Sequence, residues 1–375
     1  MTLVMKKVLI TGSDGFIGKN LLVDLKHSNS FEIIRYDIEH DRAYLKEALK
    51  DIDFVFHLAG VNRPEGNEEF SEGNIELTRF LVDSLIENNN LVPVVLTSST
   101  QAEMDNPYGK SKLEAEHIIM DYIQKGGKGY IFRLTNVFGK WCKPDYNSVV
   151  ATFCHNIATG KEISISNPDK MLELVHIDDI IADFTNLLKN PELNGSDKIL
   201  TVEPIYSVTL GKLADMIRSF REISRSCMIP DLKDDFTRKL HSTYLSYVPI
   251  NEAKYPLELR TDERGYIFEL IKSDSLGQIF VSRTKPGITR GNHFHHLKNE
   301  KFCVIDGNAI IKSRHLITNE IYSFEVSGDK PEVVNILPGY THSITNTGNT
   351  ELITLFWANE PFNQEKPDTY FEKVE

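Results

Sequence analysis

Apolar and polar positions follow two different patterns along the chain. Up to about residue 240, short apolar runs alternate with stretches in which apolar residues recur at helical spacing, which is typical of β-α-β units around a parallel sheet. From about Pro256 onward, short strands follow one another between glycine or asparagine turns, which predicts an all-β sandwich or barrel. We therefore predict a doubly wound α/β domain over 1–250 and an all-β domain over 251–375.

The expected strands are short and regularly placed. In the first half they are KKVLITG (6–12), FEIIRY (31–36), DFVFHLAG (53–60), PVVLTSS (93–99) and GYIFRL (129–134). In the second half they are GYIFELI (265–271), GQIFVSRT (277–284), EKFCVIDGNAIIKSR (300–314), EIYSFEVSGD (320–329), PEVVNIL (331–337) and TELITLFWAN (350–359).

Composition narrows the class of protein. The chain has 375 residues, 41% hydrophobic and 26% charged, which is enough for two domains that each bury a core. We expect no membrane span and no signal peptide, and hence a cytoplasmic location. A net charge of -12 argues against nucleic acid as a partner. The four cysteines form no C-x-x-C pair, so neither a disulfide framework nor a thiolate zinc site is expected.

Three glycines at intervals of three residues follow the first predicted strand. Gly12, Gly15 and Gly18 precede a predicted helix, where they permit a tight turn and a close approach of backbone N–H groups to a pyrophosphate. This pattern predicts a dinucleotide site. The alternative is an ordinary strand-to-helix turn that contains glycine. The cofactor contacts expected here are Gly12, Asp14, Gly15, Phe16, Ile17 and Gly18.

The end of the second predicted strand bears on the choice between NADH and NADPH. Arg35 would pair with a 2′-phosphate, whereas Asp37 would accept hydrogen bonds from a free ribose. NADPH is our prediction and NADH stays open. The strand end after His57 is expected to bring Leu58, Ala59 and Gly60 to the same crevice.

Tyr108 and Lys112 lie four residues apart at the start of a predicted helix, so they share one helix face. A protonated lysine beside a phenol lowers the pKa of the phenol, which lets the tyrosine give a proton to a carbonyl oxygen as a hydride arrives at carbon. Ser98 and Ser99 end the preceding strand, and we prefer Ser99 as the hydroxyl that binds the same oxygen.

The glycine turn, strand-end serine and Tyr-x-x-x-Lys, in this order, resemble the extended short-chain dehydrogenase/reductase family over most of 6–190. That resemblance implies NAD(P) chemistry on a sugar linked to a nucleoside diphosphate. It also implies a substrate pocket at the Arg-x-x-Asn-x-x-Gly stretch and around His176. The expected substrate contacts are Arg133, Asn136, Lys143 and His176, with a solvated Lys143 as the alternative.

The second half contains a group of side chains suited to a metal ion. His293 and His295 share one face of a strand, Glu300 can return after a turn, and His342 can meet them from a neighbouring strand. Three imidazoles and one carboxylate suit zinc or another divalent metal, and do not by themselves identify it.

The paired histidine motifs resemble the cupin superfamily over about 260–370, apart from a glycine that directly follows Pro338. Cupins include 3-epimerases of 4-keto sugars. A base would then remove the C3 proton, and the adjacent candidates are Lys301, His296 and Tyr340, of which Lys301 is our choice.

The fusion as a whole resembles a family of bifunctional capsular polysaccharide enzymes, through strings such as DNPYG, FGKWCKP, STYLSY, KPGIT and KPDTYF. The resemblance implies a UDP-2-acetamido-2,6-dideoxy-4-hexulose substrate, NADPH, zinc, a homodimer and a 6-deoxy-L-talosamine-type product on the route to N-acetyl-L-fucosamine.

Two alternatives remain open at this stage. The cupin could be a non-catalytic binding or assembly module beside a plain 4-keto-sugar reductase, although an intact ligand set argues against it. The first half could instead retain its cofactor and perform a redox-neutral epimerisation or dehydration.

Overall fold

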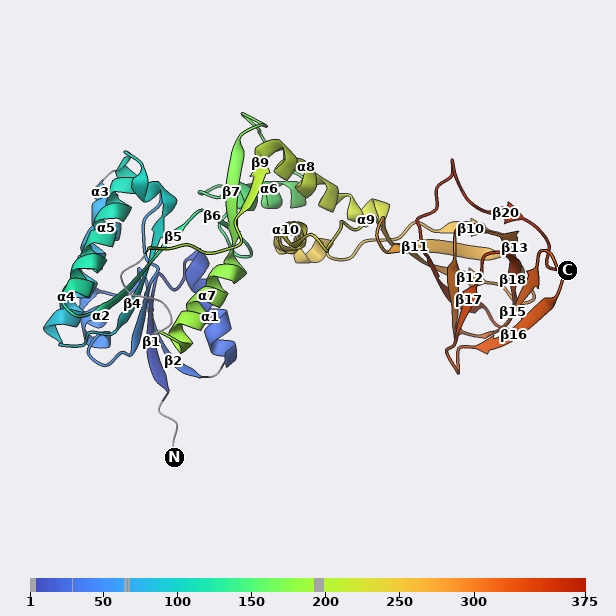
Figure 1. Cartoon of the computed structure of the whole chain (residues 1–375), viewed down its shortest axis with the longest axis horizontal. Coiled ribbons are helices and arrows are strands. Elements are labelled where there is room, and N and C mark those ends of the chain that lie inside the picture. The colour runs from blue at the N-terminus through green and yellow to red at the C-terminus, as the bar shows by residue number, and fades with distance from the viewer. Residues whose placement is uncertain (1–4, 29, 64–65, 67, 192–198) are drawn as a thin grey trace. The chain divides into compact units, whose positions relative to one another are not determined.

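The computed structural model describes residues 5–28, 30–63, 66, 68–191 and 199–375. Their contacts divide the chain into two compact units, one made of Met1–Ile217 and Lys239–Val248, the other of Arg218–Arg238 and Pro249–Glu375. The first unit is a parallel α/β domain and the second is an antiparallel all-β domain (Figure 1). The predicted fold class is therefore confirmed. Within the described residues, no helix combines the length and the apolar character needed to cross a membrane.

The first unit is built on a six-stranded parallel sheet of order β2-β1-β3-β4-β5-β8, beside a small sheet of order β6-β7-β9. Its strands are β1 (Lys6–Thr11), β2 (Phe31–Tyr36), β3 (Phe54–His57), β4 (Pro93–Ser99), β5 (Lys128–Leu134), β6 (Asn136–Phe138), β7 (Met171–His176), β8 (Ile199–Leu200) and β9 (Tyr206–Thr209). Its helices are α1 (Phe16–Ser28), α2 (Arg42–Ala48), α3 (Glu68–Phe70), the π-helix η1 (Ser71–Glu76), α4 (Leu77–Glu87), the 3₁₀-helix η2 (Thr100–Glu103), α5 (Pro107–Gln124), α6 (Val149–Ala158) and α7 (Ile177–Lys189). Two further helices, α8 (Leu210–Arg221) and α10 (Asp235–Leu245), span the division between the units.

Strand residues alternate between two hydrophobic cores, one on each face of this sheet. Val8 and Ile10 pack with α1 and α7, whereas Leu9 between them packs with α2, α4 and α5. Both faces are covered, which explains why the strands read as continuous apolar runs. The carboxyl ends of the parallel strands meet at one edge, where strand-end polar residues come together.

The second unit consists of two antiparallel sheets, of order β10-β11-β12-β19-β14-β17 and β16-β15-β18-β13-β20. Their facing side chains form one core that includes Phe302, Ile311, Ile344 and Phe356. The strands are β10 (Arg260–Asp262), β11 (Gly265–Ser273), β12 (Gly277–Thr284), β13 (Thr289–Phe294), β14 (Glu300–Asp306), β15 (Asn308–His315), β16 (Ile321–Ser327), β17 (Val333–Ile336), β18 (Tyr340–Asn346), β19 (Leu352–Ala358) and β20 (Tyr370–Phe371). Two short helices, α9 (Ile223–Ser226) and the 3₁₀-helix η3 (Ile250–Glu252), precede them.

The segment Arg218–Arg238 belongs by its contacts to the second unit, although it precedes Lys239–Val248 of the first. β10 is short and pairs with only the first part of one edge of β11. The segment pairs with β11 further along, at Lys272. Lys272 N donates to Cys227 O (2.7 Å), and Ile229 N donates to Lys272 O (2.8 Å). The contact-based units therefore do not divide at a single point, and the domain boundary at residue 250 stays a prediction.

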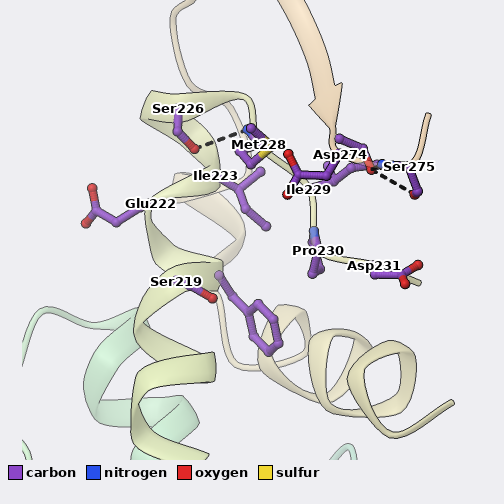
Figure 2. A pocket seen from close by; sticks show the side chains of 12 residues that line it. Ser219, Glu222, Ile223, Ser226, Met228, Ile229, Pro230, Asp231, Asp274 and Ser275 are labelled. Atoms are coloured by element: carbon purple, nitrogen blue, oxygen red, sulfur yellow. Dashed lines mark hydrogen bonds between the residues drawn. The ribbon is translucent and has the colours of Figure 1, made fainter. Parts of the chain in front are cut away.

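A cavity of about 670 Å³ lies against this segment and the β11–β12 turn (Figure 2). Its lining includes the carboxylates of Glu222, Asp231 and Asp274 but, among its twelve described residues, no lysine, arginine or histidine. A nucleoside diphosphate requires cationic or N–H donors around its phosphates. The cavity is therefore poorly suited to a nucleotide sugar.

We predict that Ile229→Pro weakens the pairing of this segment with β11. Proline removes the N–H that Lys272 O accepts, a hydrogen bond whose loss costs about 1 kcal/mol. Hydrogen exchange of the Lys272 amide should accelerate in this variant. Ile229→Ala, which keeps the N–H, is the control, and equal protection of Lys272 in the two variants would contradict the pairing.

Candidate functional site

The turn between β1 and α1 is too tight for any residue other than glycine at two positions. A Cβ on Gly12, whose φ is +68°, would lie 2.7 Å from the backbone of Ala59, and a Cβ on Gly18 would lie 2.2 Å from Gly12 O. Gly15 N donates to Gly12 O (3.0 Å), which closes the turn at the N-terminus of α1. The predicted contacts from Gly12 to Gly18 thus form one cradle of the kind that holds a pyrophosphate.

Arg35 and Asp37 both reach this turn from the end of β2. Arg35 forms an ion pair with Asp14 and its Nε lies 3.3 Å from Ser13 Oγ. Asp37 accepts from Asp14 N (2.6 Å). A 2′-phosphate would therefore meet a guanidinium that Asp14 already holds, so the geometry keeps both NADPH and NADH open.

The end of β3 lies against the same turn. His57 is fully buried, with its ring between the hydroxyls of Thr11 (2.7 Å) and Thr78 (2.9 Å). Burial lowers the pKa of His57 to about 3, so its ring is neutral and serves to fix the strand ends. The next residues, Leu58, Ala59 and Gly60, follow at the edge of the cradle, and a Cβ on Gly60 would lie 3.0 Å from Lys112 Nζ.

Tyr108, Lys112 and Ser99 come together where β4 ends and α5 begins. The Nζ of Lys112 donates to Thr97 O (3.2 Å) and lies 5.9 Å from the centre of the Tyr108 ring. Burial lowers the pKa of Lys112 to about 8. The pKa of Tyr108 is raised, mainly by burial, and its hydrogen bond with Ser99 offsets only part of that rise. Because Ser98 is buried and bound to Glu116 instead, this geometry favours Ser99 as the third member.

The side chains of the four expected substrate contacts differ in the partners that they already bind within the protein. Arg133 is held by Glu116 and Glu103 through three nitrogen atoms (2.9, 2.7 and 2.6 Å), so direct substrate binding would require these bonds to open. Asn136 donates to Glu173 O (3.1 Å). Lys143 is exposed and lies over the Tyr146 ring.

His176 is the fourth of these residues. It is buried, caps the start of α7 and accepts from Asp178 N (3.3 Å). Burial lowers its pKa to about 4, so the ring is neutral near pH 7. Its observed role is structural, and a substrate contact stays a prediction.

In the second unit the four predicted metal ligands converge. Donor atoms of His293, His295, Glu300 and His342 all lie within 4.8 Å of one another. His293 and His342 are register partners on β13 and β18, after a bulge at Asn292. The Nε2 atoms of His295 and His342 lie 3.4 and 3.3 Å from Glu300 Oε2.

The cluster fits a metal ion because three of its buried ring nitrogens make no hydrogen bond within the described part of the chain, although two of them lie within ion-pair distance of Glu300. His295 Nε2 and both ring nitrogens of His342 are buried without a hydrogen-bond partner among the described residues, a condition that is costly unless a ligand is bound. His295 Nδ1 contacts Asp368 O (2.5 Å), which leaves Nε2 free to coordinate. Burial would raise the pKa of Glu300, but the neighbouring histidines hold it well below its usual range.

The structure does not bring Lys301 to this cluster. Glu300 and Phe302 point into the barrel, whereas Lys301 between them is exposed and donates to Asn335 on β17 (2.6 Å). His296 is exposed and packs edge-on against Tyr370 (5.0 Å), and Tyr340 packs against His315 (4.9 Å). Lys301 therefore faces away from the cluster, and its role as the base stays a prediction.

Two supporting residues were not anticipated. Asp368 accepts the backbone N–H groups of His296, Leu297 and Lys298 (3.0, 2.8 and 2.7 Å), so it fixes the loop after the second ligand. Nothing in its spacing indicates this role. Glu116 lies four residues after Lys112, and that spacing was a usable signal that the same helix face continues inward.

Each half of the chain matches the model of a known protein family. Residues 8–202 match the model described as the NAD dependent epimerase/dehydratase family, and residues 260–370 match the polysaccharide biosynthesis C-terminal domain. This chain belongs to the NAD dependent epimerase/dehydratase family. A nicotinamide dinucleotide is accordingly its cofactor class.

Similarity to individual proteins extends over the full length. The chain is 43% identical over 365 residues to the UDP-2-acetamido-2,6-beta-L-arabino-hexul-4-ose reductase of Pseudomonas aeruginosa, covering 97% of this chain and 98% of that protein. The crystal structure of the capsular polysaccharide assembling protein CapF from Staphylococcus aureus is 44% identical, with a TM-score of 0.90 and coverage of 98% and 100%. A CapF structure with the inhibitor 3-isopropenyl-tropolone is 38% identical, with a TM-score of 0.86 over 98% and 100%. The resemblance to enzymes of capsular polysaccharide synthesis that the sequence predicts is confirmed.

We predict that the purified full-length protein holds about one divalent metal ion per chain, since four ligands make one site. Metal analysis by mass spectrometry should find it in the wild type and a large loss in His342→Gln and Glu300→Gln. His296→Gln is the matched control, because His296 lies outside the cluster. Full metal content in His342→Gln would contradict this ligand set.

Proposed function

We propose that this chain is a bifunctional nucleotide-sugar enzyme of surface polysaccharide synthesis. Its second unit epimerises C3 of a UDP-2-acetamido-2,6-dideoxy-4-hexulose, and its first unit then reduces C4 with NADPH to a UDP-N-acetyl-6-deoxy-L-talosamine-type product on the route to UDP-N-acetyl-L-fucosamine. The observation that carries the proposal is the 43% identity, from end to end, to a protein named as a reductase of such a 4-keto sugar. Zinc and a homodimer, which the resemblance implies, and the cytoplasmic location expected from the sequence complete the proposal.

The order of the two reactions follows from the chemistry of the sugar. A proton on C3 is acidic only while C4 is a ketone, because the negative charge left by its removal spreads onto the carbonyl oxygen. Reduction of C4 abolishes that acidity. Epimerisation must therefore precede reduction.

In the reduction, the chain's own residues handle the proton and the geometry. The cofactor, when bound in the glycine cradle, supplies a hydride to C4. Tyr108 gives its hydroxyl proton to the C4 oxygen, Lys112 stabilises the resulting phenolate by its charge, and Ser99 binds the same oxygen. Each of these roles requires the proximity that the structure has for the three side chains.

In the epimerisation, His293, His295, Glu300 and His342 would hold a divalent metal. Bound there, the metal would supply a positive charge that polarises the ketone oxygen. The three buried ring nitrogens that make no hydrogen bond among the described residues support this proposal over a purely structural barrel, because such atoms destabilise a fold that has no metal to bind. The competing proposal is a plain 4-keto-sugar reductase with a non-catalytic cupin.

The proposal predicts that solvent deuterium enters C3 of a UDP-4-keto-6-deoxy-N-acetylhexosamine before any reduction. Proton NMR in deuterium oxide should show loss of the C3 signal with wild-type protein, and conversion to a 4-hydroxy sugar only after NADPH is added. His342→Gln should lose the exchange, and Glu320→Gln, an exposed residue of the second unit outside the cluster, should keep it.

Other outcomes separate the alternatives. Reduction without prior exchange would favour the plain reductase and contradict the epimerase. Consumption of one NADPH for each 4-hydroxy sugar formed would exclude a redox-neutral epimerisation or dehydration with a retained cofactor.

Cofactor choice gives a second prediction for this proposal. Arg35→Ala should raise the KM for NADPH about tenfold or more and leave the KM for NADH nearly unchanged, because the lost charge-assisted bond is to a group that NADH lacks. Steady-state kinetics with both cofactors measures this. Equal effects on the two KM values would remove Arg35 from the 2′-phosphate site.

A further inference from the structure

Arg133 was expected to contact the substrate, but its guanidinium points toward α5. Its Nε and Nη2 bind the two carboxylate oxygens of Glu116 (2.9 and 2.7 Å), and its Nη1 binds Glu103 (2.6 Å). The Arg133 side chain is only 14% exposed and that of Glu116 only 4%. A bidentate pair buried to this degree has one geometry.

Each carboxylate in this arrangement belongs to an element that carries part of the Tyr108–Lys112–Ser99 group. Glu116 lies on α5, four residues after Lys112 and eight after Tyr108, on the same helix face. Glu103 ends η2, the short helix that Ser99 caps. Arg133 itself lies on β5, opposite Ser98 in the register of β4 and β5.

Glu116 also binds β4 directly, because Ser98 Oγ donates to its Oε1. One turn earlier on α5, Lys112 Nζ donates to Thr97 O (3.2 Å). Two buried polar contacts, one helical turn apart, thus fix α5 to β4. They set the rotation of α5 about its own axis and its distance from the strand. The close packing of Gly109, where a Cβ would lie 2.1 Å from Gln101 O, allows little freedom between α5 and η2.

We propose that Arg133 and Glu116 are positioning residues, and not substrate contacts, and that they hold α5, η2 and the end of β4 so that Tyr108 and Ser99 meet the same substrate oxygen. This inference rests on the proposed reductase activity of the first unit. It deepens that activity by naming what aligns its proton donor.

The test uses full-length protein and the variants Glu116→Gln, Glu116→Asp and Arg133→Lys. Glu116→Gln keeps the shape of the side chain, and Arg133 keeps Glu103 as a partner, so no buried cation is left unpaired. Glu114→Gln is the matched control, since Glu114 lies on the same helix but is exposed and pairs with Arg79. Circular dichroism checks that each variant is folded.

Hydrogen exchange by mass spectrometry tests the anchoring without any turnover. Exchange over 99–112 should be about tenfold faster in Glu116→Gln than in the wild type, because local opening becomes easier, and unchanged in Glu114→Gln. Wild-type exchange rates in a folded Glu116→Gln would overturn the proposal. This measurement decides the anchoring even if the protein reduces no keto sugar, in which case the proposed function fails separately.

Kinetics then test whether the anchoring serves catalysis. Misplacement of the reacting groups should lower kcat about 10- to 100-fold in Glu116→Gln and Arg133→Lys, with KM for the sugar nucleotide and NADPH within about threefold of wild type. Glu116→Asp, which keeps the charge on a shorter stem, should restore part of the lost kcat. A raised KM with normal kcat in Arg133→Lys would mean that Arg133 binds substrate, and normal kcat in Glu116→Gln would make the pair purely structural; either result overturns the proposal.

Discussion

Burial of polar side chains is the constraint on which both units depend. A polar group removed from water requires a partner, and a charged one requires a counter-charge or a changed protonation state. His57 meets this requirement between two threonine hydroxyls, and Glu116 meets it through Arg133. The ring nitrogens of His342 make no hydrogen bond among the described residues, and Nε2 lies 3.3 Å from Glu300 Oε2, which distinguishes its surroundings from an ordinary core. The same physical rule thus separates structural from ligand-binding groups in two unrelated folds.

Much of the fold was predictable from the sequence because the spacing of apolar residues indicates which side chains are buried. Continuous apolar runs between helical stretches imply strands covered on both faces, and β1, β3 and β4 have that environment. The glycine turn was predictable because Gly12 and Gly18 leave no room for a Cβ. The convergence of His293, His295, Glu300 and His342 was predictable because alternate residues of an extended segment share a face, which holds for His293 and His295 despite the bulge beside them.

The remaining features depend on contacts between segments that no local pattern encodes. Arg133 begins the Arg-x-x-Asn-x-x-Gly motif that was expected to bind substrate, yet Glu116, seventeen residues earlier, holds its guanidinium. Lys301 is adjacent to a ligand in sequence, but strand alternation points it outward. The return of Arg218–Arg238 to β11 depends on an edge that is free only because β10 is short. The local sequence was misleading in each case, because contacts with other segments determine where these side chains point and which strand edge is free.

The path of the backbone has a consequence for how such a protein could have arisen. The chain passes between the two units three times, near residues 217, 238 and 248, before it completes the second. A gene breakpoint at any one position within this stretch would leave one unit without a segment that it contacts. The two halves are therefore not simply concatenated modules, and exchange of one of them by recombination would have to carry the intervening segment with it.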